Sequence, residues 1–275
     1  MAFLRAEFMS YSLKRIVPIT VILPCDTTNF RNLGPEPARP PYKTLYLLHG
    51  IYGSDMDWVA GTNIQRLARE RQLAVIMPAG ENHFYTDAGN AGEQYGEFIG
   101  KELVEVTRRM FRLSDKREDT YIAGLSMGGY GAYMNGLKYH DTFSHVACLS
   151  MAMIDKKSNW KGIPPMDDTE FAKAVFGTED IDKNLKSQRS MTEYCLEKGV
   201  RFPELYFTIG NQDILYQANV DFHRYLEEKG VAHIFTTSDG IHNFDFWGRE
   251  IVNILDWLPH GEKITVADSG NVFLS

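Results

Sequence analysis

The chain contains little cysteine. Only three cysteines, Cys25, Cys148 and Cys195, occur in 275 residues, an odd number without the spacing of a metal site. A disulfide framework and a structural zinc site are therefore not expected, since both need more cysteines or cysteine and histidine at short, regular intervals. The low count is typical of thiols that a cytoplasm keeps reduced.

Long apolar runs are missing as well, so no segment approaches the length of a membrane span. Residues 1–7 have neither the apolar core nor the small-residue cleavage site of a secretory signal, although a signal already removed would leave no trace. We therefore predict a cytoplasmic protein without a membrane partner.

Positively charged residues are fewer than negatively charged ones. Lysine and arginine number 29 against 36 aspartate and glutamate residues, which gives a formal net charge of −7 at pH 7. This balance argues against nucleic acid as a partner and favours a neutral or cationic substrate. The sequence also has no internal repeat, and its 44% of hydrophobic residues can bury one substantial core. We expect a single domain over residues 1–275.

The most informative stretch covers residues 119–132 and predicts a buried strand, a sharp turn with one serine, and a helix of small residues. Ser126 lies between Gly124 and Gly128, in the G-x-S-x-G pattern of a nucleophile elbow. Larger side chains at the two glycine positions would collide with this strained turn, which lifts the serine hydroxyl clear of the sheet. The strand before and the helix after favour a nucleophile over an ordinary glycine-rich turn.

A serine needs a base to take its proton and an acid to orient that base. Residues 204–210 predict a strand, and Asp213 lies on the loop that follows it. The next predicted strand, residues 233–237, leads into the loop that carries His242. Both side chains are therefore expected at the carboxyl edge of the sheet beside Ser126, in the chain order Ser, Asp, His of α/β-hydrolase proteins.

Two other carboxylates compete for the position of the acid. Asp239 and Asp245 are closer in sequence to His242 than Asp213 is. Asp213 is preferred because it directly follows a strand, but the sequence leaves an exchange with either rival open.

Two backbone N–H groups should hold the oxyanion that forms during acyl transfer. Met127 directly follows the nucleophile and is predicted to supply one of them. The apolar strand at residues 44–48 ends in a glycine-containing loop, and Ile51 in this loop is predicted to supply the other, with His49 bracing the loop. An ordinary strand-ending glycine turn is the alternative.

Strand and helix signals alternate along most of the chain, which predicts a mostly parallel sheet with helices on both faces, an α/β-hydrolase fold. Residues 6–10 and 15–23 are expected to open the sheet as an antiparallel pair. Helices are expected near residues 63–71, 97–111, 190–198 and 217–229.

The alternation of strand and helix signals is interrupted at residues 151–186, where an insertion would lie above the carboxyl edge of the sheet. We predict either a lid-like wall over the site, with Trp160 as a substrate contact, or a small satellite core. Other aromatic residues on or near the edge loops are candidate substrate contacts, each with packing as the alternative. They are Tyr52, Trp58, Phe84, Tyr85 and Tyr216.

Four stretches together resemble the esterase D superfamily. They are Leu47-Leu48-His49-Gly50, Tyr85-Thr86-Asp87, residues 114–131 around the nucleophile turn, and Gly240-Ile241-His242-Asn243-Phe244. The chain is most similar to the tributyrin-esterase-like branch, which is related to the acetyl xylan and feruloyl esterases of carbohydrate esterase family 1. More distant relatives are the S-formylglutathione hydrolases and mycolyltransferases. Asn243-Phe244 departs from the commoner pattern, in which an acid and an aromatic residue follow the histidine.

The resemblance implies ester hydrolysis through Ser126, Asp213 and His242, with the amides of Ile51 and Met127 as the oxyanion hole. It implies neither a metal nor another cofactor, and relatives of this branch often form homo-oligomers. We predict a carboxylesterase for short acyl or hydroxycinnamoyl esters of plant carbohydrate, so the partner would be a small-molecule or oligosaccharide ester. The alternatives are a thioesterase of the S-formylglutathione hydrolase type and a noncatalytic binding module on the same fold.

Overall fold

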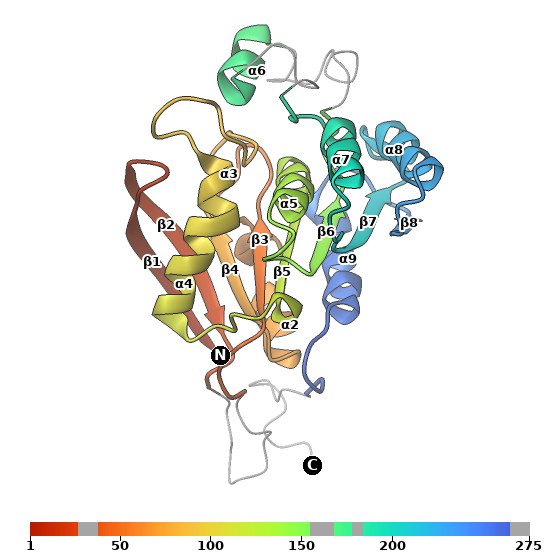
Figure 1. The fold of residues 1–275 in the computed structure, drawn as a ribbon. Coiled ribbons are helices and arrows are strands. Elements are labelled where there is room, and N and C mark those ends of the chain that lie inside the picture. The colour runs from red at the N-terminus through yellow and green to blue at the C-terminus, as the bar shows by residue number, and fades with distance from the viewer. Residues whose placement is uncertain (27–37, 155–167, 178–183, 265–275) are drawn as a thin grey trace.

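The computed structural model describes residues 1–26, 38–154, 168–177 and 184–264, and its centre is an eight-stranded sheet (Figure 1). The strands follow the spatial order β1-β2-β4-β3-β5-β6-β7-β8. The strands from β3 to β8 are parallel, whereas β1 pairs antiparallel with β2 and β2 pairs antiparallel with β4. Their bounds are β1 Ala2–Ser10, β2 Arg15–Leu23, β3 Thr44–Leu48, β4 Ala74–Pro78, β5 Thr120–Leu125, β6 His145–Leu149, β7 Glu204–Gly210 and β8 Ile234–Ser238.

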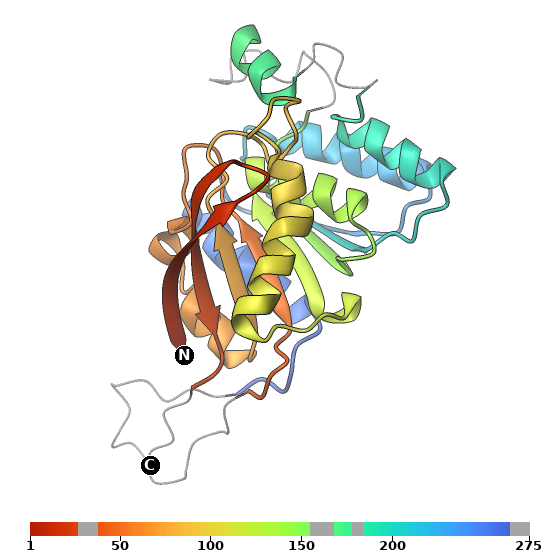
Figure 2. The same cartoon turned by 60° about the vertical axis from the view of Figure 1, so that its left-hand side comes forward.

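Helices cover both faces of this sheet, as the alternating sequence pattern predicts. Figure 2 shows the layering from the side, with α4 in front of the strands and α9 behind them. One apolar core lies between the sheet and α4, α5, α7 and α8, and a second lies between the sheet and α1, α2 and α9. The helices are α1 Asp57–Gly61, α2 Ile64–Glu70, α3 Tyr95–Glu97, α4 Leu103–Phe111, α5 Met127–Lys138, α6 Thr169–Phe176, α7 Gln188–Glu197, α8 Tyr216–Glu228 and α9 Phe244–Trp257.

The central strands are buried throughout and mostly apolar because both of their faces are covered. Every residue of β3, β4 and β5 is buried. In β3, Tyr46 and Leu48 enter the first core, while Leu45 and Leu47 enter the second. Continuous apolar runs of this kind are typical of parallel strands between two helical layers.

The helix predicted over residues 97–111 is longer and less regular than the sequence pattern indicates. It starts with α3 at Tyr95, passes through a π-helical turn at Phe98–Glu102, and continues as α4 to Phe111. Gly100 lies in the π turn, where an added Cβ would come within 1.9 Å of the Tyr139 ring. The helix packs here at a distance that only glycine permits.

The predicted insertion at residues 151–186 is described only in part, and Trp160 lies outside the described residues. Figure 1 shows α6 at the end of the molecule opposite the N-terminus. Phe176 in α6 is buried, and its ring lies 5.4 Å from that of Phe84 and 6.0 Å from that of Tyr130. This part of the insertion therefore packs on the domain as an extension of the first core, whereas a satellite core or a lid around Trp160 stays a prediction.

Within the described ranges, no helix has both the length and the apolar character needed to cross a membrane.

Candidate active site

The backbone of Ser126 is held in a strained conformation between β5 and α5. Its φ of 52° and ψ of −117° lie outside the regions that non-glycine residues favour. Its N–H donates to the carbonyl of Leu149 at 2.9 Å, and its own carbonyl accepts from Ala152 N–H at 3.0 Å. The end of β6 and the residues after it therefore fix the turn that presents the serine.

The two glycines that flank the turn are required by close backbone packing. A Cβ on Gly124 would lie 2.3 Å from the carbonyl oxygen of Gly128, and a Cβ on Gly128 would lie 2.6 Å from that of Leu48. Backbone atoms cannot move aside as the end of a flexible side chain can. These contacts give a physical basis for the G-x-S-x-G spacing.

The structure brings Ser126, His242 and Asp213 into one hydrogen-bonded chain, although they come from three separate loops. His242 Nε2 lies 3.0 Å from Ser126 Oγ, and His242 Nδ1 lies 2.9 Å and 3.1 Å from the two carboxylate oxygens of Asp213. The Asp213 side chain is fully buried, whereas the His242 side chain is 23% exposed. The His242 side chain is therefore accessible from solvent, while the Asp213 carboxylate is shielded from water.

Neither rival carboxylate is hydrogen-bonded to His242 in the described part of the chain. Asp239 accepts a hydrogen bond from the Asn211 amide at 2.8 Å. Asp245 lies in the first turn of α9 and accepts from Asn243 at 3.3 Å. Asn243, where relatives often carry an acid, caps α9 by accepting from Phe246 N–H at 3.2 Å.

Hydrogen bonds keep Asp213 ionised in spite of its burial. Burial alone would raise the pKa of this carboxyl, but hydrogen bonds from His242, Leu215 N–H and Ser150 outweigh it and lower the pKa below its ordinary value. A carboxylate can only accept, so His242 Nδ1 donates its proton to Asp213. In the neutral imidazole Nε2 is then free to accept the proton of Ser126.

The Ile51 and Met127 amides are both available to hold an oxyanion. Neither N–H has an acceptor among the described residues. A Cβ added to Gly50 would lie 3.5 Å from Cβ of Ser126, so the backbone of the Ile51 loop runs directly against the nucleophile. An oxyanion hole at these two amides stays a prediction.

Three buried hydrogen bonds and one exposed hydrogen bond hold the Ile51 loop in place. His49 Nε2 accepts from Gly80 N–H at 2.8 Å, so Nδ1 carries the proton that it donates to the Gly50 carbonyl at 2.6 Å. Burial lowers the pKa of His49, which keeps this ring neutral. The Tyr85 hydroxyl donates to the His49 carbonyl at 3.0 Å, and Asn82 Oδ1 accepts from Tyr52 N–H at 2.8 Å.

Three of the predicted substrate contacts are instead packing residues. Trp58, Phe84 and Tyr85 are only 1–2% exposed. Trp58 donates from its indole N–H to the Leu48 carbonyl at 3.0 Å, and Phe84 packs within the core. Phe84 and Tyr85 have positive φ angles of 52° and 55° in their loop. Of the other candidates, Tyr52 is exposed, Tyr216 is half-buried at the start of α8, and Trp160 is not described.

Ser150 and Trp247 are site residues that the sequence did not reveal. The Trp247 indole N–H donates to Ser150 Oγ at 3.0 Å, and the Ser150 hydroxyl is among the groups that lower the pKa of Asp213. An indole nitrogen can only donate, so the Ser150 hydroxyl keeps its own proton for the carboxylate. Trp247 also packs edge-on against His242, with ring centres 4.9 Å apart. The two residues position the acid and the base together.

We expect Ser150→Ala to lower kcat/KM by about tenfold to a hundredfold, since a hydrogen bond to a charged group contributes about 1.5–3 kcal/mol. The pKa of Asp213 should rise, as ¹³C NMR titration of its carboxyl would show. Trp247→Phe retains the hydroxyl and should have the smaller effect on this pKa. Loss of thermal stability with the Asp213 pKa unchanged would instead reveal a purely structural role.

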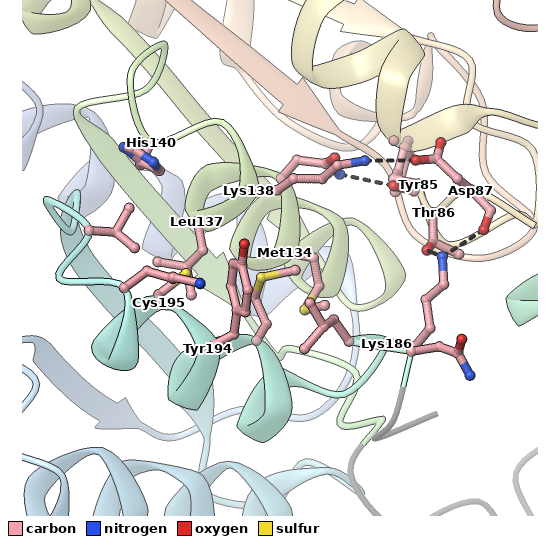
Figure 3. Close-up of a pocket in the computed structure, with 17 residues that line it drawn as sticks. Tyr85, Thr86, Asp87, Met134, Leu137, Lys138, His140, Lys186, Tyr194 and Cys195 are labelled. Carbon is pink, nitrogen blue, oxygen red and sulfur yellow. Dashed lines mark hydrogen bonds and ion pairs between the residues drawn. The ribbon is translucent and has the colours of Figure 1, made fainter. Parts of the chain in front are cut away.

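A groove of about 400 Å³ lies away from this site, beside the C-terminal half of α5 and α7 (Figure 3). Lys138 pairs there with Asp87 at 2.8 Å, and Lys186 donates to Thr86 and to the Asp87 carbonyl. The groove contains none of the three hydrogen-bonded residues, so it is not the candidate reaction site. Among the described residues, no group of three potential ligands could hold a metal ion.

Comparison with known proteins gives consistent matches over most of the chain. The model of the family Esterase, described as "Putative esterase", matches residues 10–258. A relative from Caldicellulosiruptor saccharolyticus named acetyl esterase is 38% identical over 267 residues, covering 94% of this chain and 98% of the relative.

Solved structures match over a similar extent. The S-formylglutathione hydrolase FrmB of Staphylococcus aureus superposes with a TM-score of 0.80 at 30% identity, covering 94% of this chain and 98% of that chain. FphF of the same organism, described as a fluorophosphonate-binding serine hydrolase, has a TM-score of 0.81 at 28% identity and the same coverage. With the mostly parallel sheet, these matches confirm the predicted α/β-hydrolase fold.

Proposed function

The chain belongs to the Esterase family and is a serine-type ester hydrolase, and from this premise we propose that Ser126 attacks short acyl esters. In this proposal His242 is the base and Asp213 the acid. The observation that carries it is the unbroken chain of hydrogen bonds from the Asp213 carboxylate through His242 to Ser126 Oγ, at 2.9 and 3.0 Å.

The first chemical step forms an acyl-enzyme. His242 Nε2 takes the Ser126 proton as Oγ attacks the ester carbonyl, and the carbonyl oxygen becomes an oxyanion facing the amides of Ile51 and Met127. Collapse of this intermediate breaks the bond to the leaving alcohol, which receives its proton from His242. The buried Asp213 carboxylate stabilises the imidazolium that exists between the two proton transfers.

The second step releases the acid. Water takes the place of the alcohol and gives its proton to His242 as it attacks the acyl-enzyme. The same amides hold the second oxyanion, and the proton returns to Ser126 as the acid departs. Apart from the ester and the water, the groups that act in this cycle are side chains and amides of the chain itself.

The acyl group that we propose is short, with acetyl as the first choice, because the acetyl esterase relative is 38% identical over nearly the whole chain. Hydroxycinnamoyl esters, and plant carbohydrate as the source of the alcohol, are carried only by the resemblance to carbohydrate esterase family 1. Thioester hydrolysis is a second candidate, because the S-formylglutathione hydrolase of S. aureus is 30% identical with a TM-score of 0.80.

A substrate panel tests this proposal. We expect the purified protein to hydrolyse 4-nitrophenyl acetate and butyrate with a kcat/KM at least tenfold above those for methyl ferulate and S-formylglutathione. A higher kcat/KM for S-formylglutathione would support the thioesterase instead. No turnover of any ester, together with no labelling of Ser126 by a fluorophosphonate probe, would leave only the noncatalytic binding module.

Three further predictions concern the protein as a whole. A single domain over residues 1–275, a cytoplasmic location and a homo-oligomeric state all remain to be tested. Light scattering coupled to size-exclusion chromatography would measure the oligomeric state. Limited proteolysis would test the single domain by showing whether a stable smaller fragment exists.

A further inference from the structure

Exposed apolar side chains lie around the proposed reaction centre. Tyr52, Ile214 and Ile241 are 70%, 73% and 53% exposed. Each is the immediate chain neighbour of a proposed site residue: the oxyanion donor of the first loop, the acid and the base, respectively. We call these three side chains the apolar rim.

The fold places all three rim residues on loops at the same edge of the sheet. Its members lie on the loops that follow β3, β7 and β8, and each loop contributes one residue to the site itself. Adjacent Cα atoms are about 3.8 Å apart, so the Cα atom of each rim residue lies at this distance from the Cα atom of a proposed site residue. The Asp213 side chain points inward and is fully buried, while its neighbour Ile214 faces solvent.

The exposure of Tyr52 is not a consequence of a loose loop. Tyr52 has a positive φ of 62°, a strained conformation for a residue with a side chain, and its N–H is held by Asn82 at 2.8 Å. Strain of this kind persists where the surrounding structure enforces it, and it clusters at functional sites. Exposing an apolar side chain to water costs free energy, so exposed apolar side chains beside a reaction site call for a functional explanation.

The rim loops also lack positive charge. Residues 49–53, 211–216 and 239–245 contain no lysine or arginine, and their charged residues are all aspartates. A leaving group with carboxylates, such as glutathione, would find no cation in these loops and would meet like charge. A neutral group with an apolar face would cover the rim.

We propose that Tyr52, Ile214 and Ile241 form a leaving-group subsite that selects esters of neutral alcohols with an apolar face. This inference rests on the proposed function and adds the identity of the alcohol side to it. An aromatic alcohol and the apolar face of a sugar ring share this chemistry, so the experiment must distinguish them.

The test keeps the acetyl group constant and varies only the alcohol. The substrates are methyl acetate, benzyl acetate, 4-carboxybenzyl acetate and an acetylated xylo-oligosaccharide, with each kcat/KM divided by the rate constant for hydrolysis by hydroxide. We expect benzyl acetate to exceed both methyl acetate and 4-carboxybenzyl acetate by about tenfold, the size of discrimination that small apolar pockets reach. Preference for the oligosaccharide over benzyl acetate would identify a sugar face as the natural occupant.

Variants then assign the preference to the rim. Ile214→Ser with Ile241→Ser should reduce the ratio of benzyl to methyl acetate to about threefold or less. Ile214→Lys should selectively improve 4-carboxybenzyl acetate by supplying a cation. Ile16→Ser is the matched control, because Ile16 is 58% exposed on β2, outside the three rim loops, and should keep the wild-type ratio.

The outcomes separate this inference from the proposed function. Equal normalised rates for all acetates would overturn the subsite and leave the esterase intact, whereas no turnover of any acetate would overturn the esterase itself. A double variant that changes the oligomeric mass but not the ratio would show that the rim is a contact between subunits. An equal change in the ratio for Ile16→Ser would also contradict the assignment.

Discussion

Replacing Ser126 with alanine should lower kcat for acetate esters by a factor on the order of 10⁶ and leave KM close to the wild-type value. The variant keeps both proposed oxyanion amides and the imidazole, but it has no hydroxyl that could form the acyl-enzyme. Alanine removes only the hydroxyl that lies 3.0 Å from His242, so the fold should persist with little change in Tm. Hydrolysis of 4-nitrophenyl acetate measures the loss of activity. Mass spectrometry after treatment with a fluorophosphonate probe measures the loss of the covalent adduct at residue 126.

A second serine provides the control for this experiment. Ser144 directly precedes β6, at the amino end of that strand and therefore at the edge of the sheet opposite Ser126. Ser144→Ala should retain wild-type kcat and label normally. Residual activity of Ser126→Ala above a thousandth of the wild-type value, in protein free of wild-type contamination, would mean that another group is the nucleophile.

The positions of the candidate site were accessible from sequence because they depend on strand ends. Ser126, Asp213 and His242 each follow a predicted strand, and parallel strands place their carboxyl ends at one edge. Its place directly after a strand then favoured Asp213 over its rivals, although only the folded loops show that Asp239 is engaged with Asn211. A pattern of strands can therefore predict which residues share an edge, but not which of them touch.

The direction of loop side chains could not be predicted in the same way. Phe84 and Tyr85 lie on an edge loop, where exposure to substrate was a reasonable expectation. Both have positive φ angles of 52° and 55° and both are buried, so that one packs within the core and the other holds the His49 carbonyl. Left-handed backbone at bulky residues has no local sequence signal, since tertiary contacts impose it.

Ser150 shows a different kind of limit. It follows β6 at the same edge as the nucleophile, so its position alone was a usable signal. A serine at the end of a strand is nevertheless ordinary, and its importance comes from Trp247, nearly a hundred residues later in the chain. Long-range pairs of this kind become visible only when the fold is known.

Replacing Asp213 with asparagine should lower kcat/KM by about 10⁴-fold while the fold persists. The asparagine amide can donate to His242 Nδ1, which turns the imidazole into the tautomer with its proton on Nε2. That nitrogen then points a proton at Ser126 and cannot accept one. The neutral amide also no longer stabilises the imidazolium that forms when the serine attacks, so both the orientation and the charge of the base are lost.

The two rival carboxylates supply matched controls for this change. Asp239→Asn and Asp245→Asn remove the same charge from the neighbourhood of His242, but neither side chain is hydrogen-bonded to that ring in the part of the chain that the structure describes. Each should stay within about threefold of wild-type kcat/KM, since surface substitutions away from such contacts have small effects. If one of them lost activity by a factor near 10⁴ and Asp213→Asn did not, the acid would belong to that residue. The side chain that reaches His242 Nδ1 during turnover is therefore identified by which of three identical substitutions removes the activity.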